Sequence, residues 1–242
     1  MAKAGEDKNQ LPATGKSGAV DAFLRRVAAL PARQAGAGRG RLSFAMDATA
    51  SREPSWDRAC RLQGEMFEAA AASGGIEIEL VYYRGFNECK ASRWLKTAAE
   101  LHDAMRAVSC VGGTTQIERV LSHAIARARD GRLDALVFVG DAMEENSDRL
   151  IQLAGELGLL NVPAFIFHEG QEPAAARCFQ EIARLTRGAY CPFDSSSAAE
   201  LRALLGAVAA YVAGGRKALD DYGKRAGGSA LLLARQLGKP TA

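Results

Sequence analysis

The sequence has few residues of the kinds that usually build thiol or zinc sites. Its five cysteines are scattered and form no Cys-x-x-Cys pair, and its three histidines share no metal-ligand spacing. No uninterrupted apolar run reaches the roughly 18 residues that a membrane span needs. The first 18 residues are polar and of mixed charge, unlike a signal peptide. These absences argue against a zinc knuckle, a dithiol redox centre and a membrane anchor, and we expect a cytoplasmic protein.

The chain also lacks a basic surface in its central part. Residues 42–213 carry 17 Lys or Arg against 23 Asp or Glu, whereas residues 1–41 carry eight against three and residues 214–242 six against two. The net charge of +3 therefore conceals an acidic body with basic flanks. An acidic body disfavours binding to nucleic acid, whose phosphates attract basic patches. We expect neither nucleic acid nor membrane among the partners.

Short apolar runs alternate with amphipathic helical patterns along most of the chain. The expected strands are residues 42–46, 76–83, 90–93 (a short edge strand), 133–140, 162–167 and 189–191. The helical patterns between them cover residues 56–70, 95–108, 117–125, 147–159, 173–187 and 201–212. This alternation is typical of an α/β domain with a mainly parallel sheet.

The flanks of this alternating region have a different composition. We expect a disordered tail at residues 1–18 and a short helix (20–30) with a glycine-rich linker at 19–40. The domain itself should cover residues 41–213. Residues 214–242 form a basic extension whose apolar run, 230–237, is a candidate docked helix.

The most informative stretch follows the first expected strand. Asp47, Thr49 and Ser51 place three oxygen side chains at alternate positions, separated by alanines. Ligands of parallel α/β sheets bind at the carboxyl ends of strands, which is where this stretch lies. Hard oxygen donors suit Mg²⁺ or Mn²⁺ better than zinc or copper. Asp, Thr and Ser also cap helix starts, so a purely structural interpretation stays open.

Two further loops should emerge at the same edge of the sheet. Thr114 follows Gly112-Gly113 in a glycine-rich loop that leads into a helix. Asp141 stands directly after the strongly apolar strand 133–140. Each signal is weak alone, but their order along the chain makes the combination specific.

In this order of motifs the sequence resembles the von Willebrand factor type A (VWA) domain with its metal-ion-dependent adhesion site (MIDAS), over about residues 41–214. That family has Asp-x-Ser-x-Ser after the first strand, then a Thr often preceded by Gly-Gly, then an Asp ending a later strand. The resemblance implies a three-layer Rossmann-like fold, with about six strands, one of them an antiparallel edge strand, and helices on both faces. It also implies a site for Mg²⁺, or Mn²⁺ or Ca²⁺, whose ligands here are Asp47, Thr49, Ser51, Thr114 and Asp141.

The sequence departs from the family pattern at two points. Thr49 replaces the first serine, which keeps the hydroxyl but adds a methyl group. Ala142-Met143 follows Asp141 where the family usually has glycine, so that turn can differ in shape. Thr115 is an alternative to Thr114 as the loop ligand. Glu144 and Glu145 lie near enough to shape the rim of the site, or form a solvated helix start.

The resemblance implies a non-catalytic, metal-dependent module that binds the Asp or Glu carboxylate of a partner protein. A Mg²⁺-dependent phosphotransferase or phosphatase of the haloacid dehalogenase type is the alternative from another class, because its first strand also ends in an aspartate. That chemistry needs a second aspartate two residues later as acid and base, and Thr49 occupies that position. A third alternative is a scaffold with a vestigial metal site that binds through the helices expected at 20–30 and 230–237.

Overall fold

A six-stranded sheet forms the centre of the computed structural model, which describes residues 15–30, 39–62, 64–71, 75–131, 133–193 and 198–226. The strand order is β3-β2-β1-β4-β5-β6, and only β3 runs antiparallel to its neighbour. The strands are β1 (Gly40–Asp47), β2 (Ile76–Arg84), β3 (Glu88–Ala91), β4 (Ala135–Gly140), β5 (Ala164–Glu169) and β6 (Ala189–Phe193). The predicted α/β fold with one antiparallel edge strand is confirmed.

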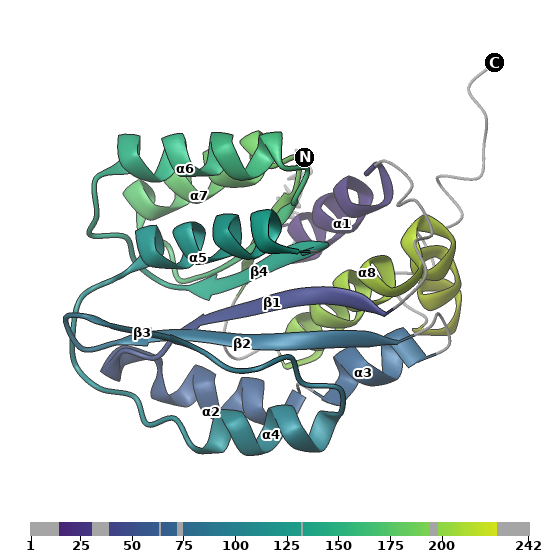
Figure 1. Cartoon of the computed structure of the whole chain (residues 1–242). Helices are drawn as coiled ribbons and strands as arrows, with labels where there is room; N and C mark the ends of the chain where they lie inside the picture. Colours follow the sequence, from purple (N-terminus) through teal and green to yellow (C-terminus); the bar gives the residue numbers. More distant parts are fainter. Residues whose placement is uncertain are drawn as a thin grey trace, which may run out of the picture.

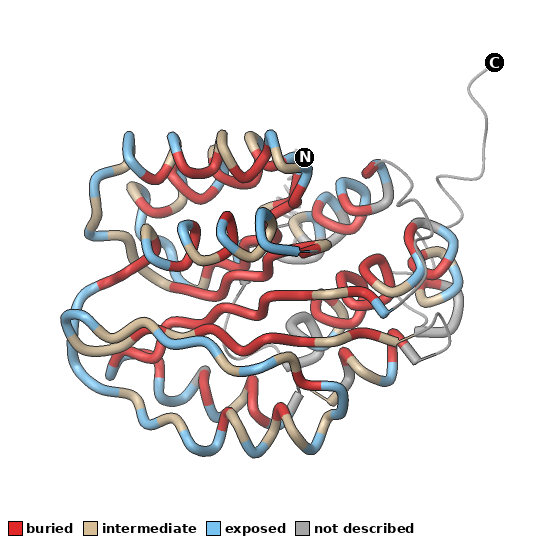
Figure 2. Tube along the Cα trace, in the orientation of Figure 1, coloured by how far each residue is buried: buried red, intermediate tan, exposed pale blue. Residues whose placement is uncertain are grey.

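Helices cover both faces of the sheet (Figure 1). One face carries α5 (Ile117–Asp130), α6 (Ser147–Leu159) and α7 (Pro173–Leu185), and the other carries α1 (Gly15–Ala28), α2 (Glu53–Leu62), α3 (Gly64–Ala71), α4 (Ala98–Arg106) and α8 (Ala198–Ala226). Most of the central sheet is buried (Figure 2): β4 is buried at every residue, and β1 and β5 are buried at all residues but one. Alternate residues of β1 face opposite layers, with Phe44 in one apolar cluster and Ala45 in the other.

One charged cluster lies inside this apolar arrangement. Glu79 on β2 is fully buried and accepts hydrogen bonds from Arg127 Nε (2.9 Å) and from Ser43 Oγ (3.2 Å), and it pairs with His123 Nε2 at 2.9 Å. Burial raises the pKa of Glu79, but the hydrogen bonds from His123 and Arg127 outweigh it and bring the pKa below its ordinary value. The cluster therefore ties α5 to the middle of the sheet as an ion pair, which gives His123 a structural role.

Several element boundaries differ from those expected. The helical stretch expected at 56–70 is divided between α2 and α3, and a short 3-10 helix, η1 (Ala50–Arg52), precedes α2. The helix expected from residue 95 begins only at Ala98, because Leu95 forms a β-bridge with Ile78 and Thr97 caps α4 through a capping box with Glu100. In the flank, α1 begins at Gly15, so residues 15–18 of the expected tail are helical. Residues 1–14 and most of the expected linker (31–38) lie outside the described residues.

The last helix extends beyond the expected end of the domain. α8 continues past Gly214 and Gly215, whose backbone angles are not helical, as far as Ala226. The chain folds back after this kink. Gly206 and Tyr222 lie in contact: a Cβ on Gly206 would lie 2.2 Å from the Tyr222 hydroxyl. Sixteen residues of straight helix would separate the two by about 24 Å. The first part of the expected basic extension thus packs on the domain, while its apolar run at 230–237 lies outside the described residues. None of the described helices is long and apolar enough to cross a membrane.

Candidate metal centre

The predicted site begins at the carboxyl end of β1, where Asp47 pairs in register with Tyr83 on β2. The Asp47 side chain is buried, and its Oδ1 accepts a hydrogen bond of 2.7 Å from the Thr49 backbone N–H. Its second oxygen, Oδ2, is also buried and forms no hydrogen bond of ordinary geometry, although the buried Tyr83 hydroxyl lies close enough to lower the pKa of Asp47. An ionised carboxylate oxygen without a donor is costly inside a protein.

Three of the other predicted residues lie in one hydrogen-bonded chain beside Asp47. Thr49 Oγ1 and Ser51 Oγ are 3.3 Å apart, and Ser51 Oγ donates to Asp141 Oδ2 over 3.2 Å. The register of β1 and β4 brings these loops together, because Met46 lies opposite Val139, two residues before Asp141. The structure therefore brings Asp47, Thr49, Ser51 and Asp141 to one edge of the sheet.

The electrostatics of this group are unfavourable without a cation. Burial raises the pKa of Asp47 most, the Thr49 hydrogen bonds and the nearby Tyr83 hydroxyl lower it, and the charge of Asp141 raises it; the net result is a raised pKa. The pKa of the buried Tyr83 is raised well above its ordinary value by burial and then by the charge of Asp47. Arg52, the next residue after the motif, is buried and directs its guanidinium to Glu169. A divalent cation beside the two aspartates would offset their repulsion.

Thr114 is not part of this hydrogen-bonded chain. Its backbone N–H donates to Gly85 O over 3.1 Å, and its side chain lines a neighbouring surface hollow. Gly113 allows that close approach, because a Cβ there would lie 2.0 Å from Gly85 O. Thr115, the alternative ligand, is occupied: its Oγ1 accepts from Glu144 N and its own N–H donates to Glu144 Oε2, each over 3.0 Å. Within the described residues the Thr114 hydroxyl makes no hydrogen bond, so of the two threonines its hydroxyl is available.

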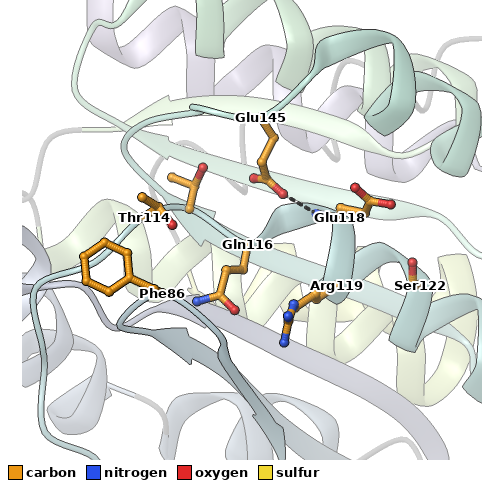
Figure 3. A pocket seen from close by; sticks show the side chains of 8 residues that line it. Phe86, Thr114, Gln116, Glu118, Arg119, Ser122 and Glu145 are labelled. Atoms are coloured by element: carbon orange, nitrogen blue, oxygen red, sulfur yellow. Dashed lines mark hydrogen bonds between the residues drawn. The ribbon is translucent and has the colours of Figure 1, made fainter.

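Glu144 and Glu145 do not form a solvated helix start, because they hydrogen-bond to Thr115 and to the first residues of α5. Besides the contacts of Glu144 with Thr115, Glu145 accepts hydrogen bonds from the backbone N–H groups of Ile117 (2.9 Å) and Glu118 (2.7 Å), as Figure 3 shows for Glu118. Gln116, the residue before α5, supplies no side-chain cap. The loop after Asp141 thus caps α5 and fixes the Thr114 loop relative to Asp141.

The donor set fits a hard divalent cation. It consists of two carboxylates and neutral hydroxyls, which are ligands for Mg²⁺, Mn²⁺ or Ca²⁺. No group of three or more His, Cys, Asp and Glu that could hold a metal occurs in the described part of the chain. A metal at this edge would therefore depend on the hydroxyls of Thr49, Ser51 and Thr114 as much as on acids, and the unpartnered Oδ2 of Asp47 offers it a free ligand atom.

Two supporting residues escaped sequence analysis. Tyr83 faces Asp47 only because of the β1–β2 register. His168, buried at the end of β5, contacts the Asp141 carbonyl through Nε2 (3.2 Å) and the Tyr190 hydroxyl through Nδ1 (2.9 Å). A carbonyl only accepts, so Nε2 carries the proton and fixes the backbone of Asp141. Burial lowers the pKa of His168, which favours this neutral form. A lone His in an apolar run gives no signal of such a role.

Solved VWA structures share this architecture. The chain superposes on a von Willebrand factor type A protein from Catenulispora acidiphila with a TM-score of 0.60, at 15% identity over 72% of this chain and 43% of that chain. It matches the SpRpn10 VWA domain with a TM-score of 0.54, at 15% identity over 69% of this chain and 94% of that domain. It also matches proximal thread matrix protein 1 from the mussel byssus, a structure with a zinc-occupied MIDAS motif, with a TM-score of 0.53, at 12% identity over 71% and 46%.

These likenesses establish the fold. The chain spans less than half the length of the first and third of these proteins. No family model and no curated protein sequence matches the chain. The described part of the chain has the VWA fold.

Proposed function

We propose that this chain, whose described part has the von Willebrand factor type A fold, is a divalent-metal-dependent protein-binding module. In this proposal Asp47, Thr49, Ser51, Thr114 and Asp141 hold Mg²⁺, or Mn²⁺ or Ca²⁺, and a partner protein supplies an Asp or Glu carboxylate. The observation that carries the proposal is the buried, unpartnered Oδ2 of Asp47 beside Ser51 and Asp141. The zinc-occupied motif of the mussel byssus protein supports metal use by this fold.

The residues of the chain account for how such a site would recognise a carboxylate. Bound there, a divalent ion supplies positive charge and a coordination position for an outside oxygen. Three of the five ligands are hydroxyls, which are neutral, so the two aspartates alone offset the charge of the ion. Asp47 is buried and Ser51 is exposed, so the ligand set runs from the end of the sheet to the protein surface. An acidic side chain of a partner can approach from the Ser51 side.

The site favours binding over phosphotransfer. Phosphotransfer of the haloacid dehalogenase type needs an acid or base two residues after Asp47. Thr49 stands there, its hydroxyl lies 3.3 Å from Ser51 Oγ, and a threonine hydroxyl is too weak an acid and too weak a base to serve as general acid or base near neutral pH. A vestigial site in a scaffold would leave Asp47 buried with no cation beside it, and the raised pKa of Asp47 reflects the cost of ionising it there. We therefore propose a module without catalysis of its own.

Calorimetric titration with Mg²⁺ and with Mn²⁺ tests the proposal. Wild type should bind one ion, and Asp47→Ala should show no binding. Asp103→Ala is the matched control, because Asp103 on α4 is an acid whose side chain is 83% exposed and lies outside the site. Equal, flat titrations of wild type and Asp47→Ala would reject metal binding and leave only the fold.

A further inference from the structure

Exposed apolar side chains border the candidate metal centre. Among the described residues the large hydrophobic side chains with high exposure are Phe86 (73%), Val111 (45%) and Leu159 (85%). Phe86 lies in the turn between β2 and β3, next to Gly85, whose carbonyl accepts the Thr114 N–H. Val111 donates its backbone N–H to Ala48 O over 3.0 Å, inside the Asp47 motif. Two of the three thus lie on loops hydrogen-bonded to the predicted ligand loops.

A hollow of about 490 Å³ opens beside Thr114, with Phe86 on one side and Arg119 on the other (Figure 3). Its volume lies within the range of ligand pockets, about 300–1,000 Å³. The wall combines the aromatic ring with hydroxyl and amide groups, so it offers both apolar and polar contacts. Because Thr114 belongs to this wall, a metal ion held by the Thr114 hydroxyl would lie beside the hollow.

Arg119 is the group in the hollow whose charge has no acidic partner. Its guanidinium donates to Asn87 O (3.0 Å) and Asn87 Oδ1 (2.9 Å), which are neutral acceptors. In the described part of the chain no carboxylate forms a salt bridge with it. The two acids of the wall are already engaged: Glu118 pairs with Arg149 at 2.8 Å, and Glu145 caps α5. Arg119 is therefore the cation of the wall that no carboxylate of the described residues pairs with, so a carboxylate of a ligand can pair with its guanidinium.

We infer that the hollow is a second recognition subsite for a peptide segment of the protein partner. The segment carries the metal-binding Asp or Glu, and close to it in sequence a second carboxylate for Arg119 and an aromatic or long aliphatic side chain for Phe86. This inference rests on the proposed function, because the metal holds the first carboxylate. It adds that the partner is recognised by two acids and one apolar group, so that a lone carboxylate does not suffice.

A displayed library of random peptides with one fixed aspartate tests this subsite on the full chain in Mg²⁺. Wild type should enrich peptides with a second acid and an apolar residue near the fixed aspartate. Arg119→Glu should reverse the preference from a second acid to a Lys or Arg, and Phe86→Ser should remove the apolar preference. Binding of all enriched peptides should fall at least tenfold with a chelator.

Matched controls separate subsite effects from general surface changes. Arg129→Glu makes the same charge reversal at the other end of α5, where Arg129 pairs with Glu156, and Leu159→Ser removes the other exposed apolar side chain. Neither should change the enriched pattern. Mg²⁺-dependent enrichment with the same pattern in wild type, Arg119→Glu and Phe86→Ser would overturn the subsite and leave the proposed function standing. No Mg²⁺-dependent enrichment with any variant would overturn both.

Discussion

Replacing Asp47 by asparagine should have opposite effects with and without metal. The variant keeps an oxygen to accept the Thr49 N–H but removes a buried charge whose second oxygen has no hydrogen-bond partner. An unsatisfied buried polar group costs about 1–3 kcal/mol, and a charged one more. In chelator we therefore expect the free energy of unfolding of Asp47→Asn to exceed that of wild type by about 1 kcal/mol.

The effect of Mg²⁺ should be confined to wild type. A ligand at 100 times its Kd stabilises the folded state by about 2.7 kcal/mol. For a chain of this size about 1 kcal/mol shifts Tm by roughly 2–4 °C, so wild type should gain about 5–11 °C. Asp47→Asn should stay within roughly 1 °C of its value in chelator, because the charge that attracts the ion is absent.

Thermal unfolding followed by circular dichroism, in chelator and in Mg²⁺, measures both effects. Asp103→Asn makes the same chemical change at an exposed acid and should behave as wild type. The pKa of folded Asp47 is raised, so wild type in chelator should lose stability as pH rises from the unfolded value, about 3.9, through the folded value. Asp47→Asn should lack that loss. A large destabilisation of Asp47→Asn in chelator, together with an equal Mg²⁺ response in both proteins, would refute this reasoning.

Three further predictions concern the framework of the site. Glu79→Gln should cost about 3 kcal/mol at pH 7 in urea unfolding, because it breaks a buried charge cluster. Since the folded pKa of Glu79 is lowered, its contribution should vanish as pH falls below about 4.3 through the folded value, and an unchanged difference at low pH would contradict this. Gly113→Ala should lower Mg²⁺ affinity at least tenfold in calorimetry, since its Cβ would meet Gly85 O; equal affinity would show that the loop tolerates the shift. Glu145→Ala removes the cap of α5 and should cost about 1 kcal/mol in urea unfolding, whereas no loss would mean that water replaces the cap.

The sheet could be predicted from sequence because β4 is a short apolar run and β2 alternates apolar and charged residues along its first half. β4 is buried at every residue, and its run ends at Gly140, one residue before Asp141. The short edge strand β3 was also expected, since its position follows the turn after β2. Periodicity could not show that Leu95 would leave its helix for a β-bridge, because that contact depends on a residue 17 positions away. The apolar periodicity also gave no indication that α8 reverses direction at Gly215, where φ is +65°.

Part of the candidate site could also be predicted, because most of its residues lie in local sequence patterns. Asp47, Thr49 and Ser51 lie within five residues of one another in the sequence. Asp141 directly follows β4, which pairs with β1, so four of the five predicted ligands lie together. The relation of Thr114 to them depends on how the Glu145 loop caps α5, which no local pattern encodes. Acidic residues at a helix start look solvated in the sequence. Only the fold shows that Glu144 and Glu145 serve a different helix from the one that follows them.

The location of Mn²⁺ by its anomalous scattering, in crystals of the full chain grown with that ion, tests the central claim most directly. We predict one peak bounded by the side-chain oxygens of Asp47, Ser51 and Asp141, at metal–oxygen distances of about 2.0–2.6 Å as for other hard divalent cations, and the Thr114 hydroxyl turned toward it. The Ser51–Asp141 hydrogen bond, now 3.2 Å, should then be replaced by shared coordination. Crystals grown at a saturating Mn²⁺ concentration that show no peak there and keep that hydrogen bond would contradict the account.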